Sequence, residues 1–164
     1  MPDVELIRGY RAGSIGRVAE LHGTYYQQNW SFDVFFEAKV ATELAAFLCR
    51  YDHQRDGFWT ALVEGRIDGS ITIDGSNAAT KGAHLRWFVI SGALRGKGVG
   101  NQLIETAVDF CRGLGYRRVY LWTFDGLNPA RHLYEKNGFR LVEQQKGSQW
   151  GKEVNEQRFE LELG

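Results

Sequence analysis

Hydrophobic and polar residues recur along the chain in two different periods, and each change of period predicts a change of secondary structure. Residues 83–90 alternate with a period of two, which is typical of a strand. One face of this predicted strand carries Leu85, Trp87 and Val89, and the other carries His84, Arg86, Phe88 and Ile90. Both faces are largely apolar, as expected for a strand in the centre of a sheet.

The remaining elements follow from the same periods and from the residues that begin and end them. Strands are predicted over residues 4–10, 57–64, 66–74, 117–123, 139–145 and 153–163, with Gly65 turning the second into the third as a hairpin. Helices are predicted from Ser14 as N-cap, over residues 32–51, over residues 103–114 with Gly115 as C-cap, and from Asn128 as N-cap.

The order of these elements is strand, two helices, three strands, helix, strand, helix and two strands. This order predicts an α/β (α+β) fold with a mixed sheet, in which one strand-helix-strand unit forms a right-handed parallel crossover. The chain has 164 residues, of which 43% are hydrophobic, and it contains no repeat or linker. Residues 1–164 are therefore expected to form one domain.

Charge and cysteine content narrow the classes of partner. Twenty basic and twenty acidic residues cancel, so the chain lacks the positive field of a typical nucleic-acid or membrane-surface binder. Cys49 and Cys111 fall on apolar helix stripes as core thiols, and the N-terminus does not resemble a signal peptide, which favours a cytoplasmic setting. His22, His53 and His132 lack metal-ligand spacing, and no metal is expected.

A glycine-rich segment between the strand over residues 83–90 and the next helix carries the clearest chemistry. Backbone N–H groups at a helix start bind anions, and glycines let a phosphate approach them closely. A P-loop is excluded because Gly96-Lys97 is followed by Gly98 and preceded, five residues earlier, by Ser91. The dinucleotide fingerprint is excluded because position 101 is Asn101. The segment is therefore predicted to bind a pyrophosphate group, but through a motif that is neither a P-loop nor a dinucleotide fingerprint.

The segment fits the pattern Arg/Gln-x-x-Gly-x-Gly/Ala through Arg95, Gly98 and Gly100, and about 30 residues later Asn128 to Phe139 fits Asn-x-x-Ala-x-x-x-Tyr-x-x-x-Gly-Phe with the alanine displaced. In these motifs the sequence resembles the GNAT superfamily of N-acetyltransferases. Residues 115–163 also resemble acetyltransferase domains that are fused to MarR-type regulators. The resemblance implies a mixed, mostly antiparallel sheet of about seven strands, with splayed central strands and about four flanking helices.

The resemblance also implies an activity and the residues that bind the co-substrate. A GNAT protein moves an acetyl group from acetyl-CoA to a primary amine, on a small molecule or peptide, by direct attack in a ternary complex, and a homodimer is possible. The loop residues implied to hold the pyrophosphate are Arg95, Gly96, Lys97, Gly98, Val99 and Gly100. The residues implied to contact the pantetheine arm or the acetyl group are Phe88, Val89, Ile90 and Asn128.

Two residues are candidates for proton transfer. The family's general acid maps to Tyr134, which would protonate the departing thiolate, although a buried tyrosine bonded to a backbone carbonyl is the alternative. His84 stands where histone-modifying members have a glutamate base, although it could be a strand histidine without a chemical role. Trp30, Trp59 and Trp87 either line the acceptor site or belong to the core.

Two other classes of function remain open at this point. The chain could be a non-catalytic acyl-CoA-binding or sensor domain, or a regulator that binds ATP or NAD. Tyr134 at the expected position argues against the first alternative, and the second predicts affinity for ATP or NAD instead of CoA.

Overall fold

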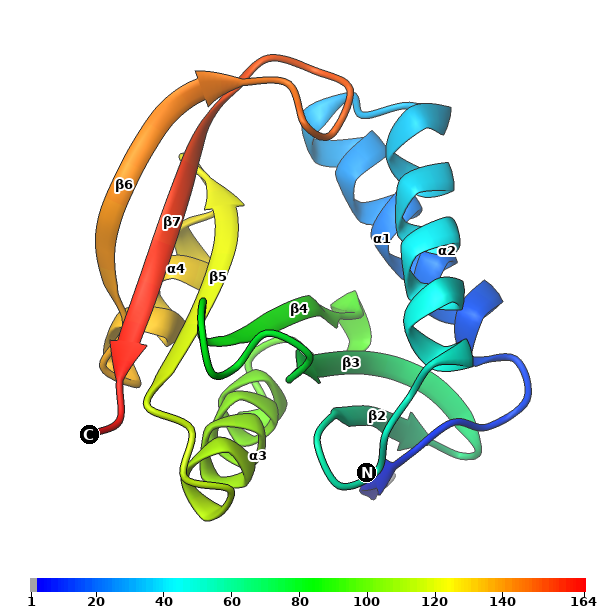
Figure 1. Ribbon diagram of the computed structural model, residues 1–164. Coiled ribbons are helices and arrows are strands. Elements are labelled where there is room, and N and C mark those ends of the chain that lie inside the picture. Colours follow the sequence, from blue (N-terminus) through cyan, green and yellow to red (C-terminus); the bar gives the residue numbers. More distant parts are fainter. Residues whose placement is uncertain (1–2) are drawn as a thin grey trace.

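The computed structural model describes residues 3–164, which form one seven-stranded sheet with helices on both faces (Figure 1). The strands are β1 (Val4–Arg8), β2 (Gly57–Val63), β3 (Arg66–Asp74), β4 (Ala83–Ile90), β5 (Arg118–Phe124), β6 (Arg140–Gly147) and β7 (Val154–Glu162). The helices are α1 (Ser14–Trp30), α2 (Val34–Cys49), α3 (Val99–Gly113), α4 (Asn128–Lys136) and the short 3-10 helix η1 (Gly92–Leu94). The predicted class and the numbers of strands and long helices are confirmed.

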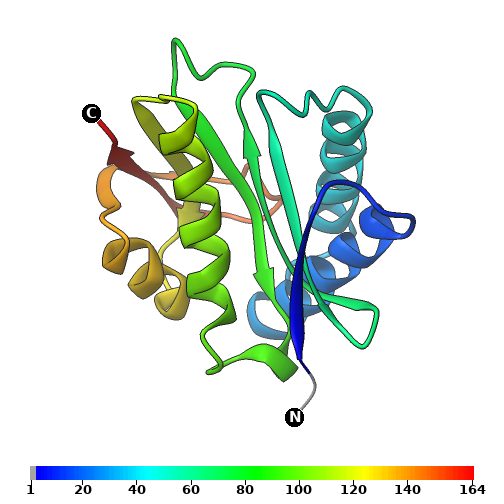
Figure 2. The same cartoon turned by 90° about the horizontal axis from the view of Figure 1, so that it is seen from below.

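The sheet has the order β1-β2-β3-β4-β5-β7-β6, and every neighbouring pair is antiparallel except β4 and β5. α1 and α2 cover one face, and α3 and α4 cover the other (Figure 2). On the second face, Leu103, Ile104 and Ala107 of α3 are fully buried against the sheet, as their helical spacing predicts. None of the helices within residues 3–164 is long and apolar enough to cross a membrane.

Two predicted turns are confirmed by their backbone angles. Glu64 and Gly65 both have positive φ, at 51° and 79°, as a two-residue hairpin between β2 and β3 requires. Gly115 follows α3 with φ of 75°, and the N–H of Tyr116 donates to the carbonyl of Cys111 at 3.0 Å, which completes a Schellman motif.

Three local predictions are wrong. Ser14 is not the N-cap of α1, because its hydroxyl donates to the Arg11 carbonyl at 2.6 Å within the preceding turn and the helix already includes it. Asn128 is also the first helical residue instead of the cap, a position that Leu127 occupies. Cys49 is exposed at the last residue of α2, so only Cys111 is a core thiol.

The predicted alternation of faces along β4 is wrong beyond Arg86, because the strand contains a β-bulge. The register passes from Ser70 opposite Val89 to Thr72 opposite Arg86, so two residues of β4 face one residue of β3. Trp87 adopts φ of 48° at this point, which is strained for a bulky side chain. The alternation of apolar and polar residues along a strand does not reveal where such an extra residue is inserted.

The bulge moves side chains to new faces. Phe88 and Ile90 pack with Leu85 against the core below α3, whereas Trp87 packs on the opposite face beneath α1 and α2. The face of the sheet toward α1 and α2 therefore carries Arg86 and Trp87 in succession. This pair forms part of the site described below.

β4 and β5 separate soon after they meet. Their parallel pairing is confined to Ala83 opposite Val119 and His84 opposite Tyr120, although each strand continues for several residues. Beyond this point β5 pairs only with β7. The predicted splay of the central strands is confirmed, and it leaves a gap in the middle of the sheet.

Candidate functional site

The glycine-rich segment forms a loop at the start of α3 whose backbone N–H groups are unpaired. Gly96 and Gly98 adopt left-handed φ of 76° and 78°, which costs glycine little, and open space lies where their Cβ atoms would be. Within residues 3–164, the backbone N–H groups of residues 96–101 have no backbone or side-chain acceptor. Unpaired N–H groups and the positive end of the helix dipole favour a bound anion here.

A cavity of about 460 Å³ extends from this loop into the gap beside β4. We call it the glycine-loop cavity, and its lining includes Tyr25, Tyr26, Phe88, Val89, Ile90, Arg95, Gly96, Gly98, Gly100, Asn101, Leu127, Ala130, Leu133 and Lys136. Arg95 is fixed at its edge, with its guanidinium 4.6 Å from the ring centroid of Tyr25 in α1. The cavity is apolar in its depth and positively charged near the loop.

Most of the residues expected to bind the co-substrate line this cavity, and three do not. Lys97 is exposed on the loop but does not border the cavity. The Val99 side chain is buried in the core beneath α3, so only its backbone N–H is available at the loop. Asn128 is exposed at the first turn of α4, and Pro129 and Ala130 line the cavity in its place.

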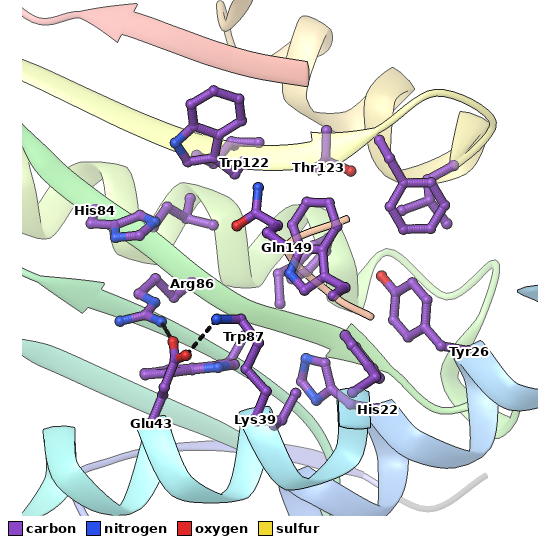
Figure 3. Close-up of a pocket in the computed structure, with 18 of the residues that line it drawn as sticks. His22, Tyr26, Lys39, Glu43, His84, Arg86, Trp87, Trp122, Thr123 and Gln149 are labelled. Atoms are coloured by element: carbon purple, nitrogen blue, oxygen red, sulfur yellow. Dashed lines mark hydrogen bonds and ion pairs between the residues drawn. The ribbon is translucent and has the colours of Figure 1, made fainter. Parts of the chain in front are cut away.

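A second cavity, of about 150 Å³, lies between the splayed strands and the helices α1 and α2. We call it the helix-side cavity, and its lining includes His22, Tyr26, Phe36, Lys39, Glu43, His84, Arg86, Trp87, Phe88, Trp122, Leu127, Tyr134, Gln149 and Trp150 (Figure 3). Tyr26, Phe88 and Leu127 border both cavities. The two cavities therefore meet where β4 and β5 have parted.

Tyr134 projects from α4 toward this junction. Its ring is buried, whereas its hydroxyl is open to the cavity and makes no hydrogen bond to another group within residues 3–164. Burial, followed by the nearby Tyr26, raises the pKa of Tyr134 well above its ordinary value. The hydroxyl is thus protonated at any working pH and free to donate a hydrogen bond. Within residues 3–164 the Tyr134 hydroxyl makes no hydrogen bond to a backbone carbonyl, which was the alternative role considered from the sequence.

His84 lies at the narrow end of the gap. Its ring stacks on Tyr120 with centroids 4.5 Å apart and planes 14° apart. Burial, with the nearby charge of Arg86 as a smaller cause, lowers the pKa of His84 to about 3. The imidazole is therefore neutral near pH 7 and is a weak base.

His22, which the sequence pattern did not single out, lies on the α1 wall of the helix-side cavity. Its Nδ1 lies 2.8 Å from the Val18 carbonyl and must donate to it, so Nε2 is the unprotonated nitrogen. Burial lowers the pKa of His22 to about 4, against the opposing effect of the Val18 carbonyl. Within residues 3–164 no group hydrogen bonds to Nε2, which can accept a hydrogen bond from a ligand.

The loop between β6 and β7 roofs the helix-side cavity, and Figure 1 shows it reaching the α1–α2 turn. The buried carboxylate of Glu156 accepts hydrogen bonds from the backbone N–H and the side-chain amide of Gln149, both at 3.0 Å. Lys152 donates to the Trp30 carbonyl at 2.8 Å. These bonds hold Gln149 and Trp150 over the cavity.

Of the three tryptophans considered from sequence, only Trp87 lines the helix-side cavity. Trp59 belongs to the core beneath α3, and Trp30 packs edge-on against Phe124. Trp122 and Trp150 line the cavity instead. Within residues 3–164, no cluster of three His, Cys, Asp or Glu side chains is placed to hold a metal ion.

The chain is similar in sequence to known acetyltransferases. The model of the acetyltransferase (GNAT) family matches residues 16–139. An uncharacterized N-acetyltransferase of Methanocaldococcus jannaschii is 27% identical over 127 residues, which make up 75% of this chain and 56% of that protein. The chain spans about half, or less, of the length of the curated relatives that it matches.

Solved structures share the fold over nearly the whole chain. An acetyltransferase from Streptococcus agalactiae superposes with a TM-score of 0.76 at 19% identity, over 98% of each chain. A protein from Salmonella typhimurium, provisionally named an acetyltransferase and solved with its cofactor acetyl-CoA, superposes with a TM-score of 0.74 at 14% identity, over 99% of this chain and 95% of that one. At these identities the likeness establishes the architecture.

Proposed function

The chain belongs to the GNAT acetyltransferase family, and on this premise we propose that residues 1–164 act as one N-acetyltransferase domain that moves the acetyl group of acetyl-CoA to a primary amine. The observation that carries the proposal is the meeting of the two cavities at Tyr26, Phe88 and Leu127. One cavity leads from an anion-binding loop and the other is lined by polar side chains. Two substrates bound in them would meet in a ternary complex, as direct attack requires.

The glycine-loop cavity fits acetyl-CoA. The unpaired N–H groups of residues 96–101 and the charge of Arg95 suit the pyrophosphate, with Lys97 at the rim and Asn128 nearby. Gly100 is required for close approach, because a Cβ there would lie 3.0 Å from Leu133 Cδ1 and 3.3 Å from Phe88 Cζ. Residues 88–90 suit the pantetheine arm, since the parted strand can pair with it as a further strand would.

The bound co-substrate supplies an activated thioester, and the chain's own groups position the acceptor and stabilise charge. A backbone N–H of residues 88–90 donates to the thioester oxygen as the acceptor nitrogen attacks. The N–C bond forms, the C–S bond breaks, and the departing thiolate takes the Tyr134 proton. The proton that the nitrogen loses as it becomes an amide restores the Tyr134 hydroxyl through water. Because the pKa of Tyr134 is raised above that of an ordinary thiol, this transfer is uphill, and we expect a modest contribution from it.

A protonated acceptor amine must lose a proton before it attacks. His84 lines the helix-side cavity, but its pKa of about 3 makes it a poor acceptor for the proton of an ordinary ammonium group. We propose that His84 remains neutral and accepts a hydrogen bond from the acceptor or from a bridging water. The amine's proton then leaves to solvent through the partly open cavity.

The main alternative is an acyl-CoA-binding or sensor domain without turnover. The Tyr134 hydroxyl supports a catalyst, because it is open to the helix-side cavity and presents a proton donor near the place where the two substrates would meet. The proposed homodimer and the finer likeness to domains fused to MarR-type regulators remain predictions.

The experiment that tests this proposal has two parts. Thermal unfolding is measured with acetyl-CoA, ATP and NAD, and a rise with acetyl-CoA alone is expected because a ligand of the folded state stabilises it. Release of free thiol from acetyl-CoA is then measured with a panel of primary amines. Stabilisation by ATP or NAD but not acetyl-CoA would favour a nucleotide-binding regulator, and acetyl-CoA binding without thiol release would favour a sensor domain.

A further inference from the structure

Three charged side chains line the helix-side cavity, and they form one connected group. Glu43 Oε2 accepts a hydrogen bond from Lys39 Nζ at 2.6 Å, and Glu43 Oε1 accepts one from Arg86 Nη2 (Figure 3). Burial alone would raise the pKa of the Glu43 carboxyl, but its bonds to Lys39 and the charge of Arg86 hold it below its ordinary value. Glu43, the one carboxylate of the cavity wall within residues 3–164, is thus already bound on both oxygens.

The two cations have donors to spare. An ammonium group has three N–H donors and a guanidinium group has five. Lys39 and Arg86 each use one of these donors in the contact with Glu43. His22 and His84 add no charge near pH 7, because burial lowers the pKa of each to about 4 and about 3. The charged lining therefore has a net charge of +1, from two cations and one anion.

We propose that the acceptor is a small primary amine that also carries a carboxylate, and that Arg86 and Lys39 bind this carboxylate; the inference rests on the proposed acetyl transfer. Arg86 is fixed for this role, since its guanidinium lies 4.1 Å from the ring centroid of Trp87 at the bulge. A second ammonium group on the acceptor would face two cations and a carboxylate that is already paired, an arrangement that like-charge repulsion disfavours.

The size of the cavity sets the length of this acceptor. Its volume of about 150 Å³ is well below the roughly 300 Å³ at which pockets for drug-sized ligands begin. Phe36 packs on Tyr26 at the junction with the glycine-loop cavity, and Glu43 lies two helical turns further along α2. With a rise of 1.5 Å per residue, the amine and the carboxylate are separated by at most about 10 Å.

The test compares amines in matched pairs that differ only in charge. Thiol release from acetyl-CoA is measured with β-alanine and γ-aminobutyrate, with the carboxamide of each, and with putrescine as a diamine. For the wild type, kcat/KM is expected to be about ten- to hundredfold higher for at least one acid than for its amide, the span of one charge-assisted hydrogen bond. Putrescine should be the poorest acceptor.

Two variants should affect this preference differently. Arg86→Gln removes a donor of the carboxylate site, so the acid-to-amide ratio should fall toward one. Glu43→Gln keeps the shape and removes the competing anion, so the ratio should stay the same or rise. A merely structural role for the group would lower both activities in both variants without changing the ratio, and thermal unfolding with acetyl-CoA reports whether each variant is folded.

Equal use of acids and amides by the wild type, or a preference for putrescine, would overturn the inference while leaving acetyl transfer intact. Failure of the proposed function is a distinct result, in which no amine releases thiol although acetyl-CoA binds. Calorimetric titration of the CoA complex with each acid and amide separates the two cases further. Equal affinity for the two members of each pair would rule out a carboxylate site in a protein of either function.

Discussion

His84 and Tyr120 lie face to face, with ring centroids 4.5 Å apart, at the last residue pair that joins β4 to β5. The stacked rings fill the narrow end of the gap, so the strands diverge from a fixed point. Three residues after His84, the bulge at Trp87 turns Phe88 toward the core beneath α3. The gap that holds the site is therefore formed by the His84–Tyr120 stack and by the bulge at Trp87, and not by a loop.

Replacement of Gly98 by glutamate should abolish acetyl-CoA binding. The new side chain would occupy the anion-binding loop and place a negative charge where the pyrophosphate is expected. Gly115→Glu is the matched control, because Gly115 has nearly the same φ (75° against 78°), lies at the other end of α3 and also has open space around it. Both variants should lose a similar amount of stability, about 1–2 kcal/mol for a left-handed residue.

The measurement is thermal unfolding of both variants with and without acetyl-CoA. The Gly115→Glu protein should keep the stabilisation by acetyl-CoA that the Gly98→Glu protein loses. An unchanged shift in a folded Gly98→Glu protein would place the pyrophosphate elsewhere.

Tyr134→Phe should separate chemistry from folding. The variant keeps the packed ring and removes a hydroxyl that is open to the cavity and has no protein partner within residues 3–164, so the free energy of unfolding should be nearly unchanged. Turnover should fall by about a hundredfold, near the lower end for general-acid assistance, because the raised pKa makes Tyr134 a weak acid. Steady-state kinetics and calorimetric acetyl-CoA affinity check this. Unchanged turnover in a chemistry-limited reaction would mean that water protonates the thiolate.

The pH dependence of kcat/KM should follow the ionisation of the acceptor amine and not the ionisation of a histidine. The pKa values of His22 and His84 are lowered to about 4 and about 3, so both rings stay neutral from about pH 5 upward. The rate should then rise with pH until the acceptor amine itself is deprotonated. Profiles for two acceptors with different amine pKa values should break at different pH. A common break near pH 6.5 would instead identify a histidine base.

Stability should decrease as the pH falls from 6.5 to 4. The pKa of His22 is about 4 in the folded chain and 6.5 in the unfolded chain, so the unfolded chain takes up the proton first. His22 should account for about 3 kcal/mol of this loss, at 1.36 kcal/mol per pKa unit. Urea unfolding from pH 7 to pH 4 measures it. The slope should be smaller for His22→Phe, whereas His132→Gln, which changes an exposed histidine, should behave as the wild type.

The sequence predicted the elements whose signals are local. β3 and β4 were given their observed bounds, because alternating apolar residues between turns define a strand within a few positions. The glycine loop was found in the same way, since left-handed glycines before a helix are a local requirement. The caps at Ser14 and Asn128 failed by one residue. The Ser14 hydroxyl bonds to Arg11 in the preceding turn, and α4 already begins at Asn128, with Leu127 as its cap.

The helix-side cavity was not predictable, because its walls come from distant parts of the chain. His22 is in α1, Glu43 is in α2 and Gln149 is in the β6–β7 loop, and only the fold brings them together. The bulge at Trp87 was missed for a different reason, since nothing in the residue types around it marks an inserted position. Arg86 was therefore assigned to a strand face without any expectation of its partner Glu43.

The meeting of two partly open cavities at Tyr26, Phe88 and Leu127 has a consequence for how the substrates come and go. In the proposed ternary complex each substrate occupies its own cavity, so neither has to leave before the other binds. Addition in either order is then permitted, and desulfo-CoA should inhibit competitively toward acetyl-CoA and noncompetitively toward the acceptor. A single compound that joins an acceptor to CoA would occupy both passages at once and gain the affinity of the two together.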